Sequence, residues 1–360
     1  DISLAGAALS GLHVLSWNVA AINLNPFEYW ITLEENPAYG AMMDGVQAFI
    51  DSPGAGDVRI DQIFTPDMFA RLRTQMLAVG WSAEHVESTA AAWRADYAER
   101  KIVSGFLKDP KLGLKRLVSM PDRYTNTIDL ASGEKAYRPS VINCYGRGDL
   151  SSVAQWWEAW NEFMFSGTIT TVDQKTNHAV TRTVASGLAP ISRAKYPAIT
   201  AAEAEYSLPL QTLTLALFDA ILVHIVTELE GGTLSGVGAG AKGVAWQPVR
   251  EQVCAALNHR KTARTLEILR TPAYVDADVM FLQECASSFV GALRDDAVLG
   301  AKFSVIAPAT QNKRNQNSLL LLSKVRKGAR RAIVAPEWLR RPLAGRRIVR
   351  RLTFSPPPPP

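Results

Sequence analysis

The feature of this sequence that most constrains its fold is a long region of helical periodicity, residues 37–262, which lies between two strand-forming regions. Residues 11–19 (Gly-Leu-His-Val-Leu-Ser-Trp-Asn-Val) alternate apolar and polar side chains towards their end, a pattern that predicts a β-strand. After the helical region, residues 278–284 form a short apolar run that predicts a buried strand. The sequence therefore predicts an α+β protein in which strands near both ends of the chain flank a mainly helical region.

Several of the expected helices carry recognisable start signals. Thr65-Pro66-Asp67 combines an N-cap residue with proline at the first helical position, and Ser82 is the expected cap of the next helix. We expect helices over residues 37–50, 65–79, 82–97, 149–165, 200–229 and 247–258, the fifth of them broken at Pro209. In the less helical stretch between the third and fourth of these helices, residues 140–144 predict a short strand.

The pattern changes after Thr271-Pro272. The strand expected at 278–284 is followed by a helix at 286–299 and by two further strands, at 303–307 and 317–323. This order of strand, helix, strand and strand is typical of an organised α/β unit.

The composition indicates an ordinary globular protein, with 47% hydrophobic and 20% charged residues. Three cysteines without a CxxC spacing argue against a disulfide framework and a structural zinc site, and favour a reducing intracellular compartment. No uninterrupted apolar run reaches the length of about 18 residues that a membrane span needs, so we expect no membrane span. Localisation itself stays unknown, because the sequence begins with Asp1 and a targeting segment cannot be read.

Positive charge is concentrated near the C-terminus. Residues 324–351 contain eleven Lys and Arg and one acid, Glu337, whereas the whole chain carries a net charge of only +5. The rest of the chain is therefore mildly acidic, with a net charge of −5. We expect residues 325–360, which end in five prolines, to form a disordered tail that could associate with nucleic acid through its charge.

Three strand segments carry a resemblance to a known family. Leu15-Ser16-Trp17-Asn18 resembles the first core strand of the endonuclease/exonuclease/phosphatase (DNase I-like) superfamily. The run 278–284, which closes in Leu-Gln-Glu, is similar to the second motif of that family, and residues 317–324 resemble a later strand that closes in Ser-Lys. The resemblance implies a phosphoester substrate, Mg²⁺ as the cofactor and a partial DNase I-like α/β sandwich core.

The resemblance also implies two site residues. Asn18 would contact the scissile phosphate and orient the metal site as a catalytic residue, and Glu284 would be a ligand of Mg²⁺. A hard cation that keeps several waters needs only one or two carboxylates and substrate phosphate, so these residue types suit it. Taken alone, Asn18 is equally compatible with a turn-capping amide, and Glu284 with a solvated carboxylate beyond a buried strand.

Two departures from the family limit what the resemblance implies. Family members separate the first two motifs by a few dozen residues, whereas roughly 240 residues separate them here. We therefore expect a first core strand in residues 11–26, a mostly helical insertion at 27–265, a continuation of the core at 266–324 and the tail at 325–360.

The second departure concerns catalysis. The sequence contains neither the Gly-Asp-x-Asn strand nor the closing Ser-Asp-His of the family. We expect a phosphoester hydrolase-family protein that is catalytically incomplete, and the alternative is a non-catalytic interaction scaffold built on the same fold. Cys285, next to Glu284, has no adjacent His or Lys that would support thiolate chemistry.

Overall fold

The computed structural model describes most of the chain between residues 12 and 324. The described residues are 12–20, 25–28, 31, 33, 35–173, 176–232, 243–311 and 317–324. The predicted disordered tail at 325–360, and with it the predicted nucleic-acid contact, lies outside the described residues.

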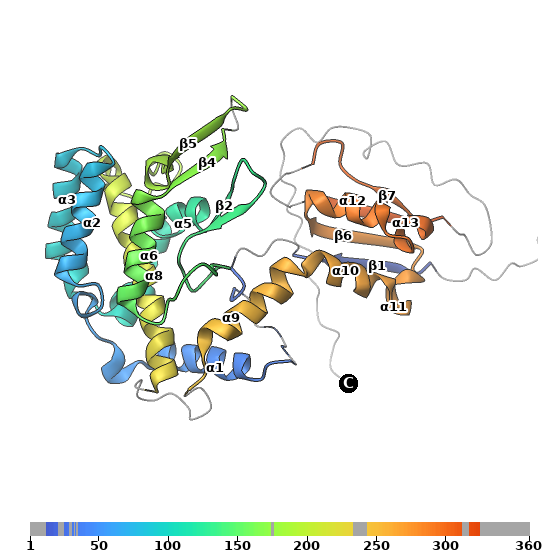
Figure 1. Ribbon diagram of the computed structural model, residues 1–360, viewed down its shortest axis with the longest axis horizontal. Helices are drawn as coiled ribbons and strands as arrows, with labels where there is room; N and C mark the ends of the chain where they lie inside the picture. Colours follow the sequence, from blue (N-terminus) through green and yellow to red (C-terminus); the bar gives the residue numbers. More distant parts are fainter. Residues whose placement is uncertain are drawn as a thin grey trace, which may run out of the picture.

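The described residues form two separate hydrophobic cores (Figure 1). One core is built from residues between Phe27 and Leu257, and we call residues 25–260 the helical part. The other core combines Leu15, Trp17 and Val19 with residues 266–321, and we call residues 12–20 and 261–324 the sheet part. Both ends of the described chain thus belong to one core, and the helical part lies between them in the sequence.

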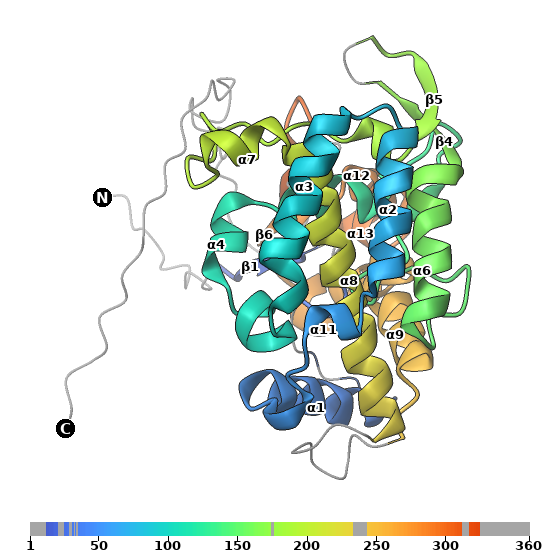
Figure 2. The same ribbon diagram turned by 90° about the vertical axis from the view of Figure 1, so that its left-hand side faces the viewer.

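The helical part contains nine α-helices and two short hairpins among its described residues. The helices are α1 (Ala38–Asp51), α2 (Pro66–Ala78), α3 (Ala83–Ala95), α4 (Pro110–Lys115), α5 (Ser119–Thr125), α6 (Val153–Asn161), α7 (Ala201–Glu205), α8 (Ser207–Gly231) and α9 (Trp246–Cys254). The hairpins pair β2 (Thr127–Asp129) with β3 (Lys135–Tyr137) and β4 (Thr168–Val172) with β5 (Ala179–Thr183). Helix α8 is the central element, since α1, α3, α5, α6, α7 and α9 all contact it (Figure 2).

The predicted helix starts are confirmed where their caps are in place. The Thr65 hydroxyl accepts a hydrogen bond from the Met68 N–H at 3.3 Å, and the Ser82 hydroxyl accepts one from the His85 N–H at 3.5 Å. The expected break at Pro209 is wrong, because the helix is interrupted at Tyr206, between α7 and α8. Pro209 lies in the first turn of α8, where a missing N–H costs no intrahelical hydrogen bond.

The strand expected at residues 140–144 is also wrong. These residues form an irregular, largely buried segment that follows β3. Side chains replace the ladder of a strand here: Asn143 Nδ2 donates to the carbonyl oxygens of Asn126, at 3.0 Å, and Arg138, at 2.8 Å. The sequence prediction also missed α4, α5 and the β4–β5 hairpin, whose short segments carry weak periodicity.

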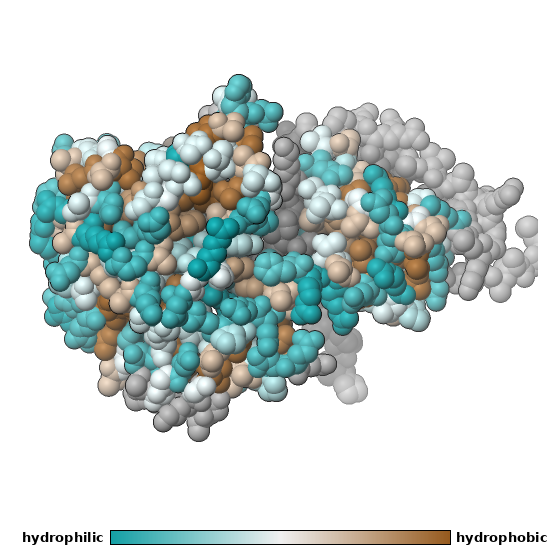
Figure 3. All heavy atoms as spheres, viewed as in Figure 1, coloured by the Kyte–Doolittle hydropathy of each residue, from teal (hydrophilic) through white to brown (hydrophobic). Residues whose placement is uncertain are grey.

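Helix α8 is the one described helix long and apolar enough to cross a membrane by length and composition. In the structure, 78% of its most apolar 18-residue window is buried inside the protein, as in the central helix of a packed core. Hydrophilic residues cover much of the visible face of the helical part, with hydrophobic residues in patches between them (Figure 3).

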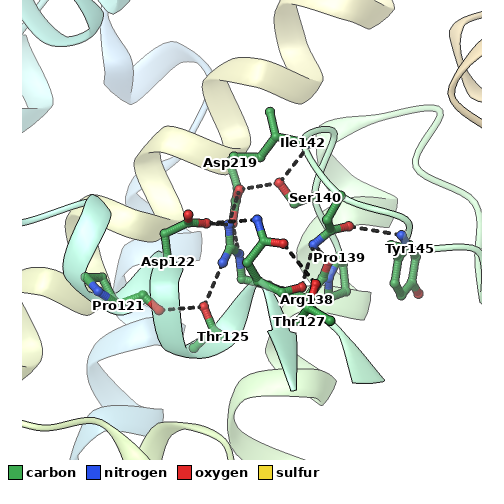
Figure 4. Close-up of polar contacts among 12 residues, drawn as sticks. Pro121, Asp122, Thr125, Thr127, Arg138, Pro139, Ser140, Ile142, Tyr145 and Asp219 are labelled. Atoms are coloured by element: carbon green, nitrogen blue, oxygen red, sulfur yellow. Dashed lines mark hydrogen bonds and ion pairs between the residues drawn. The ribbon is translucent and has the colours of Figure 1, made fainter. Parts of the chain in front are cut away.

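Inside this core, α8 carries a buried charge that is fully paired (Figure 4). The Asp219 carboxylate accepts hydrogen bonds from Arg138 Nε at 2.6 Å, from the Ser140 hydroxyl at 2.7 Å and from the Trp160 indole N–H at 3.0 Å. Arg138 also donates to Asp122 at 2.8 Å. Burial raises the pKa of the Asp219 carboxyl, and the contacts from Arg138 oppose that shift.

The sheet part is a mixed four-stranded sheet with helices on one face. Its strands, in the spatial order β1-β6-β8-β7, are β1 (Val14–Asn18), β6 (Val279–Cys285), β8 (Asn317–Ser323) and β7 (Phe303–Ile306). Its helices are α10 (Lys261–Arg270), α11 (Pro272–Val275), α12 (Ser287–Asp295) and α13 (Leu299–Lys302). β1 runs parallel to β6, and the other neighbours are antiparallel. Met280, Leu282, Leu319 and Leu321 pack against α10 and α12, whereas Phe281 on the opposite face is 45% exposed.

A run of helix with a single break joins the two parts. Helix α9 is followed directly by the π-helical turn η8 (Ala255–His259), and one non-helical residue, Arg260, separates η8 from α10. This run passes from the helical part to the sheet part (Figure 1).

Because the ion pair of Arg138 and Asp219 is inaccessible to solvent, removing one partner leaves an uncompensated buried charge. We expect Arg138→Met to lower the free energy of unfolding by about 3–5 kcal/mol, measured by urea denaturation. Arg264→Met is the matched control, because Arg264 pairs with Glu267 on the surface of α10, where ion pairs contribute little. Equal effects of the two substitutions would contradict a structural role for the buried pair.

Candidate functional site

The pairing of β1 with β6 brings Asn18 and Glu284 to the same edge of the sheet. Asn18 lies opposite Gln283 in the parallel register, and the Val19 N–H donates to the Gln283 carbonyl oxygen at 3.0 Å. The carboxyl ends of both strands therefore meet, although these residues are more than 260 positions apart in the sequence. The two site residues expected from the sequence thus belong to neighbouring strand ends.

Asn18 caps the turn that follows β1. Its Oδ1 accepts a hydrogen bond from the Ala20 N–H at 2.9 Å, the geometry of an Asx turn. The side chain is exposed at the sheet edge. The turn-capping role that the residue type suggests is therefore present, and it fixes the orientation of the amide at the surface.

Glu284 lies at an irregularity of β6. Its φ of 54° is left-handed, and the pairing of β6 with β8 shifts register between Leu282 and Cys285. A left-handed conformation costs a residue other than glycine about 1–2 kcal/mol. Ala20 is left-handed too, with a φ of 43°, so two of the four described non-glycine residues with positive φ flank this edge. Such strained residues concentrate at functional sites.

Polar side chains hold the strand ends in place. Gln283 Nε2 donates to the Ser16 hydroxyl and to the Phe281 carbonyl oxygen, both at 3.1 Å, so the first motif strand is tied to the second across the outer face. Asn317, which is 2% exposed at the start of β8, donates to the Cys285 carbonyl oxygen at 3.1 Å. These contacts fix the backbone on both sides of Glu284.

Two side chains at this edge could offer oxygen atoms to a metal ion, the exposed carboxylate of Glu284 and the amide of Asn18. Among the residues that the structure describes, no group of three or more His, Cys, Asp or Glu side chains could hold a metal ion. Mg²⁺ bound by so few protein oxygens keeps most of its waters.

Neither the thiol of Cys285, next to Glu284, nor His13 adds to the site. Burial raises the pKa of Cys285 to about 12, so its thiol stays protonated, in agreement with the sequence expectation. His13 lies at the opposite end of the sheet, where its N–H donates to Asp278 Oδ2 at 2.8 Å.

The left-handed backbone at Glu284 predicts that a glycine substitution raises stability but removes the Mg²⁺ binding that the sequence resemblance implies for this edge. Glu284→Gly relieves the strain and removes the carboxylate, so we expect the unfolding free energy to rise by about 0.5–1 kcal/mol while Mg²⁺ binding at this edge is lost. Urea denaturation and the paramagnetic effect of Mn²⁺ on nearby amide NMR signals measure the two quantities. Arg116→Gly, at a φ of 64°, is the matched control and should change stability alone. Loss of stability in Glu284→Gly would show that the conformation is not strained.

Comparison with known proteins gives one match. Residues 57–234 match the model of a domain of unknown function (DUF8234), and this segment lies wholly within the helical part. No curated protein and no solved structure matches the chain. The match therefore covers most of the region between the two strand motifs and does not extend to the sheet part.

Proposed function

We propose that the sheet part is a partial core of the endonuclease/exonuclease/phosphatase (DNase I-like) type, and that it binds a phosphoester together with Mg²⁺. The observation that carries the proposal is the parallel pairing of β1 with β6, which aligns Asn18 with the Gln283–Glu284 strand end. Two motifs that are weak separately are thereby adjacent in space. In this proposal, residues 27–265 are a mostly helical insertion into that core.

The proposed chemistry assigns one role to each residue. Glu284 would hold the metal ion and Asn18 would orient the phosphate or the metal-bound water at the strand end. A bound Mg²⁺ stabilises negative charge on a phosphate and orients an attacking water. The Asx turn preorganises Asn18 for this role, because its amide cannot rotate without losing the hydrogen bond from Ala20.

The proposal includes low catalytic activity. Hydrolysis also needs a base and a group that stabilises the developing charge in the transition state. The two motifs that supply such groups in the family, the Gly-Asp-x-Asn strand and the closing Ser-Asp-His, do not occur in the sequence. Removing one such group typically costs about 10²–10³ in rate, so a site that lacks both binds its phosphoester far better than it cleaves it.

The second candidate is a non-catalytic interaction scaffold, and the open face of the sheet favours it. Helices cover one face only, and the other presents Val14, Phe281 and Ile306 at 46%, 45% and 40% exposure. The helical part has a core of its own and could present a binding surface without help from the sheet. Both candidates share the fold and differ in whether the Glu284 edge binds phosphate.

Substitution of Glu284 separates the two candidates. With millimolar Mg²⁺, we expect the full chain to bind an inositol phosphate or a phosphodiester oligonucleotide in isothermal titration calorimetry. Glu284→Ala should weaken this binding at least about tenfold. Glu267→Ala, at an exposed carboxylate on α10, should leave binding unchanged.

The same samples give the catalytic measurement. We expect turnover of a generic phosphodiester to be at least about 10²–10³ times slower than that of an enzyme with all groups in place. Fast turnover that Glu284→Ala abolishes would show that catalytic groups lie elsewhere in the chain. If Glu284→Ala leaves phosphoester binding unchanged, the interaction scaffold becomes the favoured function.

A further inference from the structure

Two cysteines that are far apart in the sequence meet in the helical part. Cys254 is the last residue of α9 and is 3% exposed, and Cys144 lies half-buried in the irregular segment after β3. The two side chains are close enough to affect each other's ionisation. The Cys254 thiol donates to the carbonyl oxygen of Asn143, the residue before Cys144, at 3.7 Å. The irregular segment at residues 140–144 thus places the Cys144 thiol beside the C-terminal end of α9.

A third side chain is directed at the Cys144 sulfur. Asn258, one helical turn beyond Cys254, donates from Nδ2 to Cys144 Sγ at 3.1 Å. Asn258 lies in η8, the π-helical turn that follows α9. An amide donor at a sulfur favours the thiolate over the thiol, because the thiolate is the stronger acceptor.

Beside the two thiols lies a buried cation that has no carboxylate partner. Arg250 is 1% exposed, its Nη1 donates to the Ser140 carbonyl oxygen at 3.1 Å and its guanidinium lies 4.9 Å from the centre of the Trp246 ring. Among the described residues, no carboxylate comes within ion-pair distance of it. Buried charges are normally paired.

The charged and titratable groups around the thiols are Arg250, Glu251, Tyr145 and Tyr137. Glu251 is exposed on the outer side of α9, and both tyrosines stay neutral, since burial raises their pKa values. Arg250 therefore favours the ionised form of either nearby thiol.

The ionisation of the two thiols differs accordingly. Contact with the Cys254 side chain lowers the pKa of Cys144, burial opposes this shift, and Asn258 and Arg250 reinforce it. The same contact and burial raise the pKa of Cys254. Cys144 is thus the more acidic thiol of the pair, and Cys254 is the thiol that keeps its proton.

We propose that Cys144 and Cys254 form a redox-active dithiol whose oxidant is a hydroperoxide. The Cys144 thiolate attacks the terminal peroxide oxygen, so the O–O bond breaks, Cys144 becomes a sulfenic acid and the alkoxide or hydroxide leaves with a proton from solvent. The Cys254 sulfur then attacks the Cys144 sulfur, and its proton leaves with the sulfenic hydroxyl as water. Two thiols and one hydroperoxide thereby give one disulfide, one alcohol or water molecule and one water.

The disulfide would link the segment after β3 to α9, the helix through which the chain leaves the helical part. Cys144 lies within the segment that matches the domain of unknown function, whereas Cys254 lies outside it, on the helix that leads through η8 to the sheet part. Oxidation would therefore fasten the matched domain to the helix that connects the two cores. This inference is independent of the phosphoester proposal, because none of its residues lies in the sheet part.

The test is oxidation of the full-length chain by hydrogen peroxide. We expect one equivalent to yield an intramolecular cross-linked peptide containing Cys144 and Cys254, two hydrogens lighter than the reduced pair, in non-reducing peptide mass spectrometry. Before oxidation, iodoacetamide at neutral pH should modify Cys144 at least about tenfold faster than Cys285. The wild-type chain alone supplies these results, so they do not depend on whether a variant folds.

Variants assign the roles of the two sulfurs. Cys254→Ser should stop the reaction at a Cys144 sulfenic acid that dimedone traps, and Asn258→Ala should slow oxidation of Cys144. Cys285→Ser is the matched control and should form the same cross-link at the same rate. The proposal is overturned if peroxide yields no link between Cys144 and Cys254, if the link joins two chains, or if Cys285 reacts first.

Discussion

The sheet part depends on the contact between β1 and β6. A five-residue strand has no independent stability, and β1 has a strand neighbour on one side only, which lies roughly 260 residues further along the chain. Closing so long a loop has an entropic cost that grows with the logarithm of its length. The helical part reduces that cost, since its first helix, α1, packs beside α9 and Asn36 donates to Gln252 at 2.7 Å. Once the helical part folds, its two ends lie close together and β1 is brought towards β6.

Local signals in the sequence predicted the elements that local chemistry controls. The Thr65 and Ser82 caps and the apolar run at 317–323 appear where the side chains indicated. The errors arose where distant residues decide the outcome. Residues 140–144 have the composition of a strand, but the Ser140 hydroxyl donates a hydrogen bond to the buried carboxylate of Asp219 instead. No sequence pattern indicates a contact between residues 79 positions apart.

The same distinction applies to the candidate site residues. Asn18 and Glu284 could be proposed because each lies at the end of a recognisable strand, although the left-handed backbone of Glu284 depends on the register shift of β6 against β8 and could not be foreseen. The Cys144–Cys254 pair carries no sequence signal, because the two residues are 110 positions apart and meet only through the packing of an irregular segment on α9. Counting cysteines and reading their spacing pointed instead to unpaired thiols.

The run of α9, η8 and α10, which is broken only at Arg260, has a geometric consequence for the whole molecule. A helix turns by about 100° per residue, so a connector that is almost entirely helical makes the rotation of one core relative to the other depend on the number of residues it contains. The wider turn of η8 adjusts that angle by a fraction of a turn. The relative orientation of the two cores therefore depends on the length of this connector. Inserting a single residue into it would rotate the sheet part relative to the helical part and leave both hydrophobic cores intact.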